Sequence, residues 1–190
     1  MTVVRVEIDN DGGFSTLVMN TCEDLRHDFE YFIGEAKASN ADTPETMFLH
    51  QRFLRAALLS LFAYAEAIAN GWLHSLLDSQ QVEKLRHCSL DKKVEVLQEK
   101  AISSAITKPN YMDAKKLRNL FVHFTPGRDC EAFEKLSLVI VEDAANELSR
   151  WMTEMESALG LPRHDDSEEI MRAFDGLGAT TKRISSSNAG

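Results

Sequence analysis

"AALLSLFAYAEAIANGWLHSLL", residues 56–77, is the stretch that decides the fold. Apolar side chains occupy nearly every face of a helix built from it, which is typical of a helix at the centre of a bundle. The run is interrupted by Glu66, Asn70 and His74. A membrane-spanning helix rarely carries such side chains, whereas a buried helix that packs against polar neighbours can. The sequence therefore predicts a central helix of a helical bundle.

Capping residues and helix breakers place the other helices around this one. Thr43 followed by Pro44 is a strong helix start, and Gly160 with Pro162 beyond it is a strong stop. We expect Asp129 to cap the last long helix, which then runs to Gly160. The expected helices cover residues 21–38, 44–77, 90–101, 111–125 and 130–159. The prediction is an all-α bundle of about five helices in one domain, residues 20–160.

Residues 1–19 and 161–190 lie outside the expected bundle. Residues 3–8 and 14–19 alternate apolar and polar side chains around the turn-forming "DNDGG", which predicts a short β-hairpin. The tail holds one short amphipathic piece around residues 170–177, and its end has the composition of a disordered segment.

Composition narrows the function classes. The net charge is −9 and the pI about 5.2, so a broad basic face for duplex nucleic acid is not expected. The three cysteines are far apart, which suits free thiols in a reducing cytoplasm, and the N-terminus has no signal-peptide pattern. No phosphate-binding glycine loop, nucleophile elbow or metal-ligand spacing is present, so we expect no cofactor and no metal.

"KKLRNLFVHF", residues 115–124, carries the functional argument. Successive residues of a helix are rotated by about 100°, which sorts this stretch into two faces. The expected core-facing stripe consists of Leu117, Leu120, Phe121 and Phe124. The opposite face holds Lys115, Arg118, Asn119, Val122 and His123. This face is either a solvated surface or an interface, and the apolar residue in the middle of the polar strip favours an interface.

The stretch "LRNLFVHF" resembles the signature of the HEPN superfamily, in which an arginine and a polar residue are followed, after three positions, by a histidine. The matching residues are Arg118, Asn119 and His123. The context is also similar, because the motif lies in the penultimate core helix, after a long apolar helix and before another long one. The resemblance covers roughly residues 20–160.

This resemblance implies a HEPN-like, all-α domain that dimerises with the two motif helices facing each other. Catalytic members are metal-independent endoribonucleases, while other members are inactive binding or assembly domains. It implies that His123 moves a proton at the 2′-OH or the 5′ oxygen of RNA, that Arg118 stabilises the phosphorane, and that Asn119 orients them. A homodimer would supply two histidines, and the products would be a 2′,3′-cyclic phosphate and a 5′-hydroxyl.

Four further residues complete the predicted site. Lys115 and Arg128 would add positive charge for RNA, and Tyr111 would either stack on a base or lie in an interface. Glu66 needs a partner in its apolar surroundings. The partner is either a neighbouring helix, in a structural ion pair, or Arg118, in a supporting role.

Three functions are compatible with these residues. The first is a ribonuclease, for example a toxin or defence effector restrained by an antitoxin or other protein. The second is a non-catalytic dimerisation or partner-binding domain, which the acidic net charge favours. The third is nucleotide binding beside a nucleotidyltransferase partner. None involves a membrane.

Overall fold

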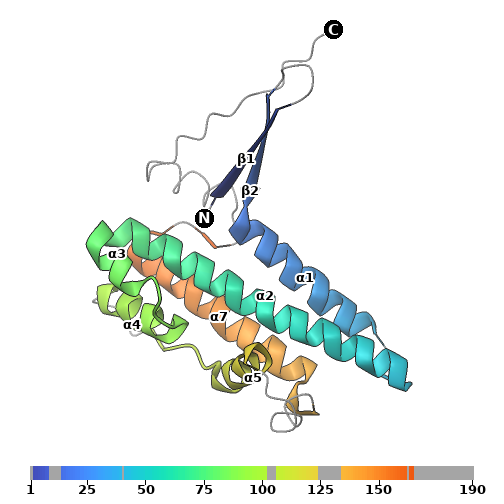
Figure 1. The fold of residues 1–190 in the computed structure, drawn as a ribbon. Helices are drawn as coiled ribbons and strands as arrows, with labels where there is room; N and C mark the ends of the chain where they lie inside the picture. The colour runs from blue at the N-terminus through green and yellow to red at the C-terminus, as the bar shows by residue number, and fades with distance from the viewer. Residues whose placement is uncertain are drawn as a thin grey trace.

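The structure, a computed structural model, describes residues 2–8, 14–39, 41–101, 106–123, 134–161 and 163–164. Its helices are α1 (Thr21–Ala38), α2 (Pro44–Leu76), α3 (Ser79–Leu85), α4 (Leu90–Lys100), α5 (Met112–Val122) and α7 (Leu138–Leu159) (Figure 1). The prediction of an all-α helical bundle is confirmed by these helices.

The central helix of the bundle is α2, as residues 56–77 predicted. Every other described helix contacts it. It begins at the predicted site, where Thr43 and Thr46 form a capping box: the Thr46 N–H donates to Thr43 Oγ1 at 3.3 Å, and the Thr43 N–H donates to Thr46 Oγ1 at 3.0 Å. This arrangement satisfies two donors that the first turn of a helix otherwise leaves unpaired.

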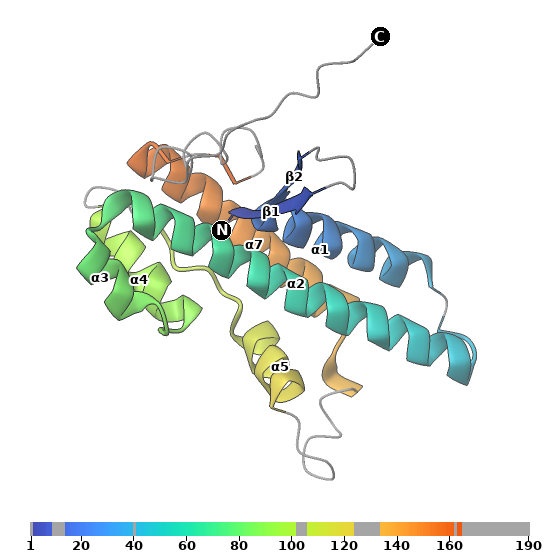
Figure 2. The same ribbon diagram turned by 45° about the horizontal axis from the view of Figure 1, so that its top comes forward.

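The other helices surround α2. Figures 1 and 2 show α1 and α7 alongside it, while the shorter α4 and α5 lie on the side away from α1. The core between α2 and α7 is filled by two indoles, Trp72 and Trp151, whose ring centroids lie 5.9 Å apart. Both side chains are almost fully covered. A packed aromatic pair of this kind ties the last helix to the central one.

The boundaries of α7 agree with the prediction at one end only. Its C-cap, Gly160, has φ 61°, a left-handed conformation that suits glycine, and this end is confirmed. The predicted start at Asp129 is wrong. The helix begins at Leu138, where Ser137 Oγ accepts from the Ile140 N–H at 3.5 Å. Ser137 is extended, so a helix running unbroken from residue 130 is excluded.

The short helix α3 was not predicted. It has only seven residues, of which Val82 and Leu85 are apolar, so its apolar periodicity is too short to reveal it. Its start does carry a local signal, because Asp78 and Gln81 form a capping box in which the Gln81 N–H donates to Asp78 Oδ1 at 2.8 Å. A search for capping boxes would have found this helix.

Two strands precede the bundle. β1 (Thr2–Ile8) pairs antiparallel with β2 (Phe14–Asn20), with Thr2 opposite Asn20 and Ile8 opposite Phe14. The expected turn at residues 9–13 and the expected tail helix at residues 170–177 lie outside the described residues.

By length and composition, α2 is the one helix of the described part that qualifies as a membrane span. However, 67% of its most apolar window is buried inside the bundle. A lipid-facing helix would expose those side chains, so this burial is the pattern of a core helix.

Candidate functional site

The motif residues lie on α5, which packs against the bundle along an apolar stripe. Leu117 is buried, and Leu120 and Phe121 are partly buried against the core. These three residues confirm the predicted stripe. Phe124, the fourth expected member, lies outside the described residues.

The helix ends earlier than predicted. Its last residue is Val122, and not a residue next to Pro126. His123 forms the C-cap with φ −114° and ψ 33°, and its N–H donates to the Asn119 carbonyl oxygen at 3.0 Å. His123 is therefore attached to the helix by its backbone, at the residue where the helical dihedral angles end.

Asn119 connects the other two motif residues. Its side-chain Oδ1 accepts from Arg118 Nη1 at 3.1 Å, and its main-chain oxygen accepts from the His123 N–H. Arg118 and Asn119 are half-buried, and His123 is exposed. Arg118 Nε is buried without a hydrogen-bond partner, and no ion pair involves Arg118 within the described residues. The structure thus places the Arg118 and Asn119 side chains in contact, whereas His123 is joined to Asn119 through the backbone alone.

The side of α5 that carries Arg118 changes from buried to exposed along the helix. Tyr111, Lys115, Arg118 and Val122 recur at helical spacing, so they share this side. Tyr111 at the N-terminal end is 2% exposed, whereas Val122 at the other end is 48% exposed. The face predicted to point outward is exposed at Val122, whereas its continuation toward Tyr111 is buried. Figure 2 shows the reason: α5 starts beside α2 and slants away from it.

Tyr111 is a packing residue and not an accessible stacking platform. Its ring meets that of Phe62 edge to face, with centroids 5.6 Å apart. Its hydroxyl donates to Asp91 Oδ1 at 2.8 Å. Burial, and to a smaller extent the Glu95 carboxylate, raises the pKa of Tyr111 to about 12. The prediction that it stacks on a base is corrected accordingly.

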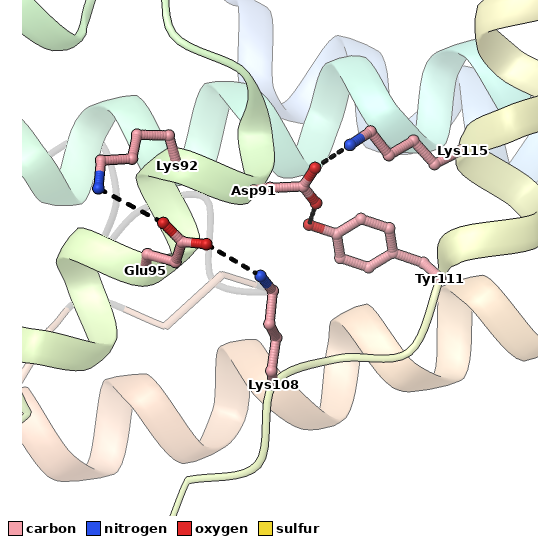
Figure 3. Close-up of polar contacts among 6 residues, drawn as sticks. All are labelled: Asp91, Lys92, Glu95, Lys108, Tyr111 and Lys115. Carbon is pink, nitrogen blue, oxygen red and sulfur yellow. Dashed lines mark hydrogen bonds and ion pairs between the residues drawn. The ribbon is translucent and has the colours of Figure 1, made fainter.

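Lys115 is also occupied within the chain. Its ammonium contacts the second oxygen of Asp91, so Asp91 receives two residues of α5 (Figure 3). A second carboxylate nearby, Glu95, pairs with Lys92 at 3.4 Å and with Lys108 at 3.2 Å. The Lys115 charge is therefore balanced by Asp91, which argues against the predicted role in attracting RNA.

Glu66 pairs with a neighbouring helix and not with Arg118. Lys93 Nζ of α4 lies 2.6 Å from Glu66 Oε1 of α2. Of the two interpretations made from the sequence, the structural ion pair is confirmed. No hydrogen bond or ion pair between the described residues Glu66 and Arg118 supports the other interpretation.

Two remaining expectations concern charge and metals. Arg128, the other predicted RNA contact, lies outside the described residues. Among the residues that are described, no group of three or more His, Cys, Asp or Glu side chains could hold a metal ion.

Asp91 is the residue that the sequence analysis missed, because an acid in the first turn of a helix usually interacts only with that helix.

The motif residues of α5 offer two chemical capabilities. A guanidinium can bind a phosphate through its two Nη groups, and an exposed imidazole can donate or accept a proton. A single chain supplies one such imidazole in the motif. Comparisons of the chain with protein-family models, with curated proteins and with solved structures found no match.

Proposed function

We propose that this chain is a HEPN-like, metal-independent endoribonuclease that acts as a homodimer through the exposed end of α5. The observation that carries the proposal is that Arg118 and Asn119 are in side-chain contact in the last turns of α5, with the exposed His123 at the C-cap of the same helix. Further support comes from Arg118 itself, which no carboxylate neutralises within the described residues. A structural surface arginine is usually ion-paired or fully solvated, whereas Arg118 is half-buried and forms no ion pair with a described carboxylate.

The proposed reaction uses the nucleophile that RNA carries. The 2′-oxygen attacks the adjacent phosphorus and loses its proton to one imidazole, while the 5′-oxygen leaves with a proton from a second imidazole. The bond to phosphorus from the 2′-oxygen forms as that from the 5′-oxygen breaks, which gives a 2′,3′-cyclic phosphate and a 5′-hydroxyl. Arg118 stabilises the charge on the phosphorane oxygens. His123 from each protomer supplies the two proton transfers.

A second function is favoured by a separate observation. Met112 and Val122 on α5 are 49% and 48% exposed, and the chain carries a net charge of −9. Exposed apolar side chains on an acidic protein suit a protein partner better than RNA. The alternative is a non-catalytic dimerisation or partner-binding domain, and an antitoxin-like partner or a nucleotidyltransferase is compatible with either function.

The test is cleavage of a fluorescent single-stranded RNA in the presence of EDTA, with both product ends identified by mass spectrometry. We expect a cyclic phosphate and a 5′-hydroxyl from the wild type. Loss of one general acid–base group typically lowers the rate about a hundredfold or more, so His123→Ala should be nearly inactive. Arg118→Ala should lose a comparable factor, because one donor to a developing oxyanion is worth about a hundredfold or more.

Matched controls separate this chemistry from contamination and from unfolding. His74→Ala and Arg86→Ala remove exposed side chains of the same types on α2 and at the end of α3. Both should cleave like the wild type when purified identically. Equal cleavage by His123→Ala would refute the proposal. Absence of cleavage by the wild type, together with a dimer that Val122→Glu disrupts, would favour the partner-binding function.

A further inference from the structure

The start of α5 is fixed to three other helices, and one carboxylate makes two of the contacts. Asp91 of α4 accepts from the Tyr111 hydroxyl through Oδ1 and pairs with Lys115 through Oδ2 (Figure 3). The Tyr111 ring packs on Phe62 of α2. The Asn110 N–H donates to Glu147 Oε2 of α7 at 3.1 Å. These contacts all lie before or within the first turns of α5.

The two groups that Asp91 holds lie on the same side of α5 as Arg118. Tyr111 and Lys115 are one turn apart, and Arg118 follows about one turn later. A ring contact and an apolar stripe allow a helix to roll about its axis, because they have little directional preference. Two charge-assisted hydrogen bonds to one fixed carboxylate do not allow this, since their geometry is directional.

A small roll would matter at the motif. A side-chain atom about 6 Å from the axis moves by about 2 Å when the helix turns by about 20°. A misplacement of about 1 Å between reacting groups can cost about a hundredfold in rate. The rotation of α5 therefore decides whether Arg118 meets the phosphate in the required geometry.

Partial burial strengthens the ion pair between Lys115 and Asp91. The Lys115 and Asp91 side chains are 25% and 20% exposed, so water screens their attraction only in part. The pair between Lys116 and Asp113 on the same helix is different, with 66% and 80% exposure, and contributes little. It therefore provides a control for the effect of removing a carboxylate near α5.

We propose that Asp91 is a positioning residue that sets the rotation of α5, and through it the placement of Arg118, for the reaction proposed above. The inference rests on that proposed function for its catalytic readout only. It assigns no contact with RNA to Asp91. Its effect on α5 can be measured without any substrate.

The experiment compares Asp91→Asn with Asp113→Asn in the full chain. Asp91→Asn keeps the size of the side chain but loses the charge that holds Lys115. We expect kcat for RNA cleavage to fall about tenfold to a hundredfold with KM changed less than about twofold, because positioning acts on the reacting geometry and not on binding. Asp113→Asn should leave both constants unchanged. Circular dichroism at the assay temperature verifies that each variant is folded.

Coupling and hydrogen exchange complete the test. Lys115→Met should reduce kcat less than Asp91→Asn, and the double variant should be no worse than Asp91→Asn alone, since both act through one contact. Effects that multiply as independent factors, or a kcat unchanged in Asp91→Asn, would overturn the inference.

The backbone amides of residues 115–122 should exchange faster in Asp91→Asn than in Asp113→Asn. If the wild type cleaves no RNA, the proposed function fails, and equal exchange in the two variants would then refute the role of Asp91 separately.

Discussion

Lys93 Nζ lies 2.6 Å from Glu66 Oε1, and this contact joins α4 to the central helix α2. The lysine is 1% exposed, whereas the glutamate is 35% exposed. The ammonium is thus buried beside α2, and the carboxylate that balances it reaches toward solvent. Removal of the carboxylate and removal of the ammonium should therefore change the stability of the fold by different amounts.

Removal of Glu66 should therefore destabilise the fold more than removal of Lys93. Glu66→Ala leaves a buried ammonium without its counter-charge, and we expect the free energy of unfolding to fall by about 3 kcal/mol or more. Lys93→Met keeps the apolar stem and leaves a carboxylate that water can reach, so we expect a change within about 1.5 kcal/mol. Urea unfolding followed by tryptophan fluorescence measures both. A larger loss in Lys93→Met than in Glu66→Ala would contradict this order.

Tyr111 predicts a dependence of stability on alkaline pH. Its pKa in the folded state is raised to about 12, mainly by burial. In the unfolded state it is about 10. The unfolded chain then releases the phenolic proton first, so the stabilisation present below about pH 10 is lost as the pH rises to about 12, by up to about 2.7 kcal/mol.

Tyr111→Phe isolates that contribution. The variant should lose stability at pH 8, because the buried hydrogen bond to Asp91 is missing, and should show a smaller further loss between about pH 10 and 12. Tyr31→Phe is the matched control, since the side chain of Tyr31 is 58% exposed. Chemical unfolding at each pH gives the slope of the free energy of unfolding against pH. Parallel slopes for the wild type and Tyr111→Phe would show that Tyr111 does not cause the dependence.

The parts of the fold that local sequence signals specify were predicted well. The start of α2 depends on Thr43 and Pro44, and the end of α7 depends on Gly160, each through contacts within one turn. The apolar stripe of α5 followed from helical rotation alone. The start of α7 was predicted wrongly because both Asp129 and Ser137 are good capping residues, and local chemistry does not choose between them.

The candidate site could be predicted only in part, because its contacts depend on how the helices pack against one another. Helical rotation assigns each residue of α5 to a side, but it does not give the slant of the helix against α2. That slant buries Tyr111 and exposes Val122 on the same side. The partners of Lys115 and Glu66 are 24 and 27 residues away in the chain, so they depend on how helices pack and not on local sequence.

In the described segment after Gly160, His164 makes several contacts with the bundle. His164 donates its N–H and its Nδ1–H to Glu156, the latter at 2.7 Å, because a carboxylate can only accept. Its carbonyl accepts from the Tyr64 hydroxyl at 2.5 Å. These contacts fix the segment after Gly160 against α2 and α7.

Loss of Glu156 should therefore free this segment. Trypsin cleaves after Arg163, which is exposed but lies beside the fixed His164. We expect Glu156→Gln to speed cleavage at this bond by about tenfold, equivalent to about 1.4 kcal/mol of local opening. Glu154→Gln is the control on the same helix, because Glu154 pairs with Arg150 and makes no contact with His164. Mass spectrometry of the fragments measures the rates, and equal rates in both variants would exclude the contact as a restraint.

Val122 tests the interface on which the proposed function depends. It is 48% exposed at the end of α5 that leaves the bundle, so a glutamate there can remain solvated in the monomer. In a dimer built on α5, the same charge would be buried next to its symmetry copy, which costs several kcal/mol. We expect Val122→Glu to weaken self-association at least a hundredfold without loss of folding, as measured by sedimentation velocity. Val139→Glu, at 61% exposure on α7, should associate like the wild type. A monomeric wild type, or a dimer that only Val139→Glu disrupts, would remove α5 from the interface and with it the pairing of two His123 side chains that the proposed cleavage requires.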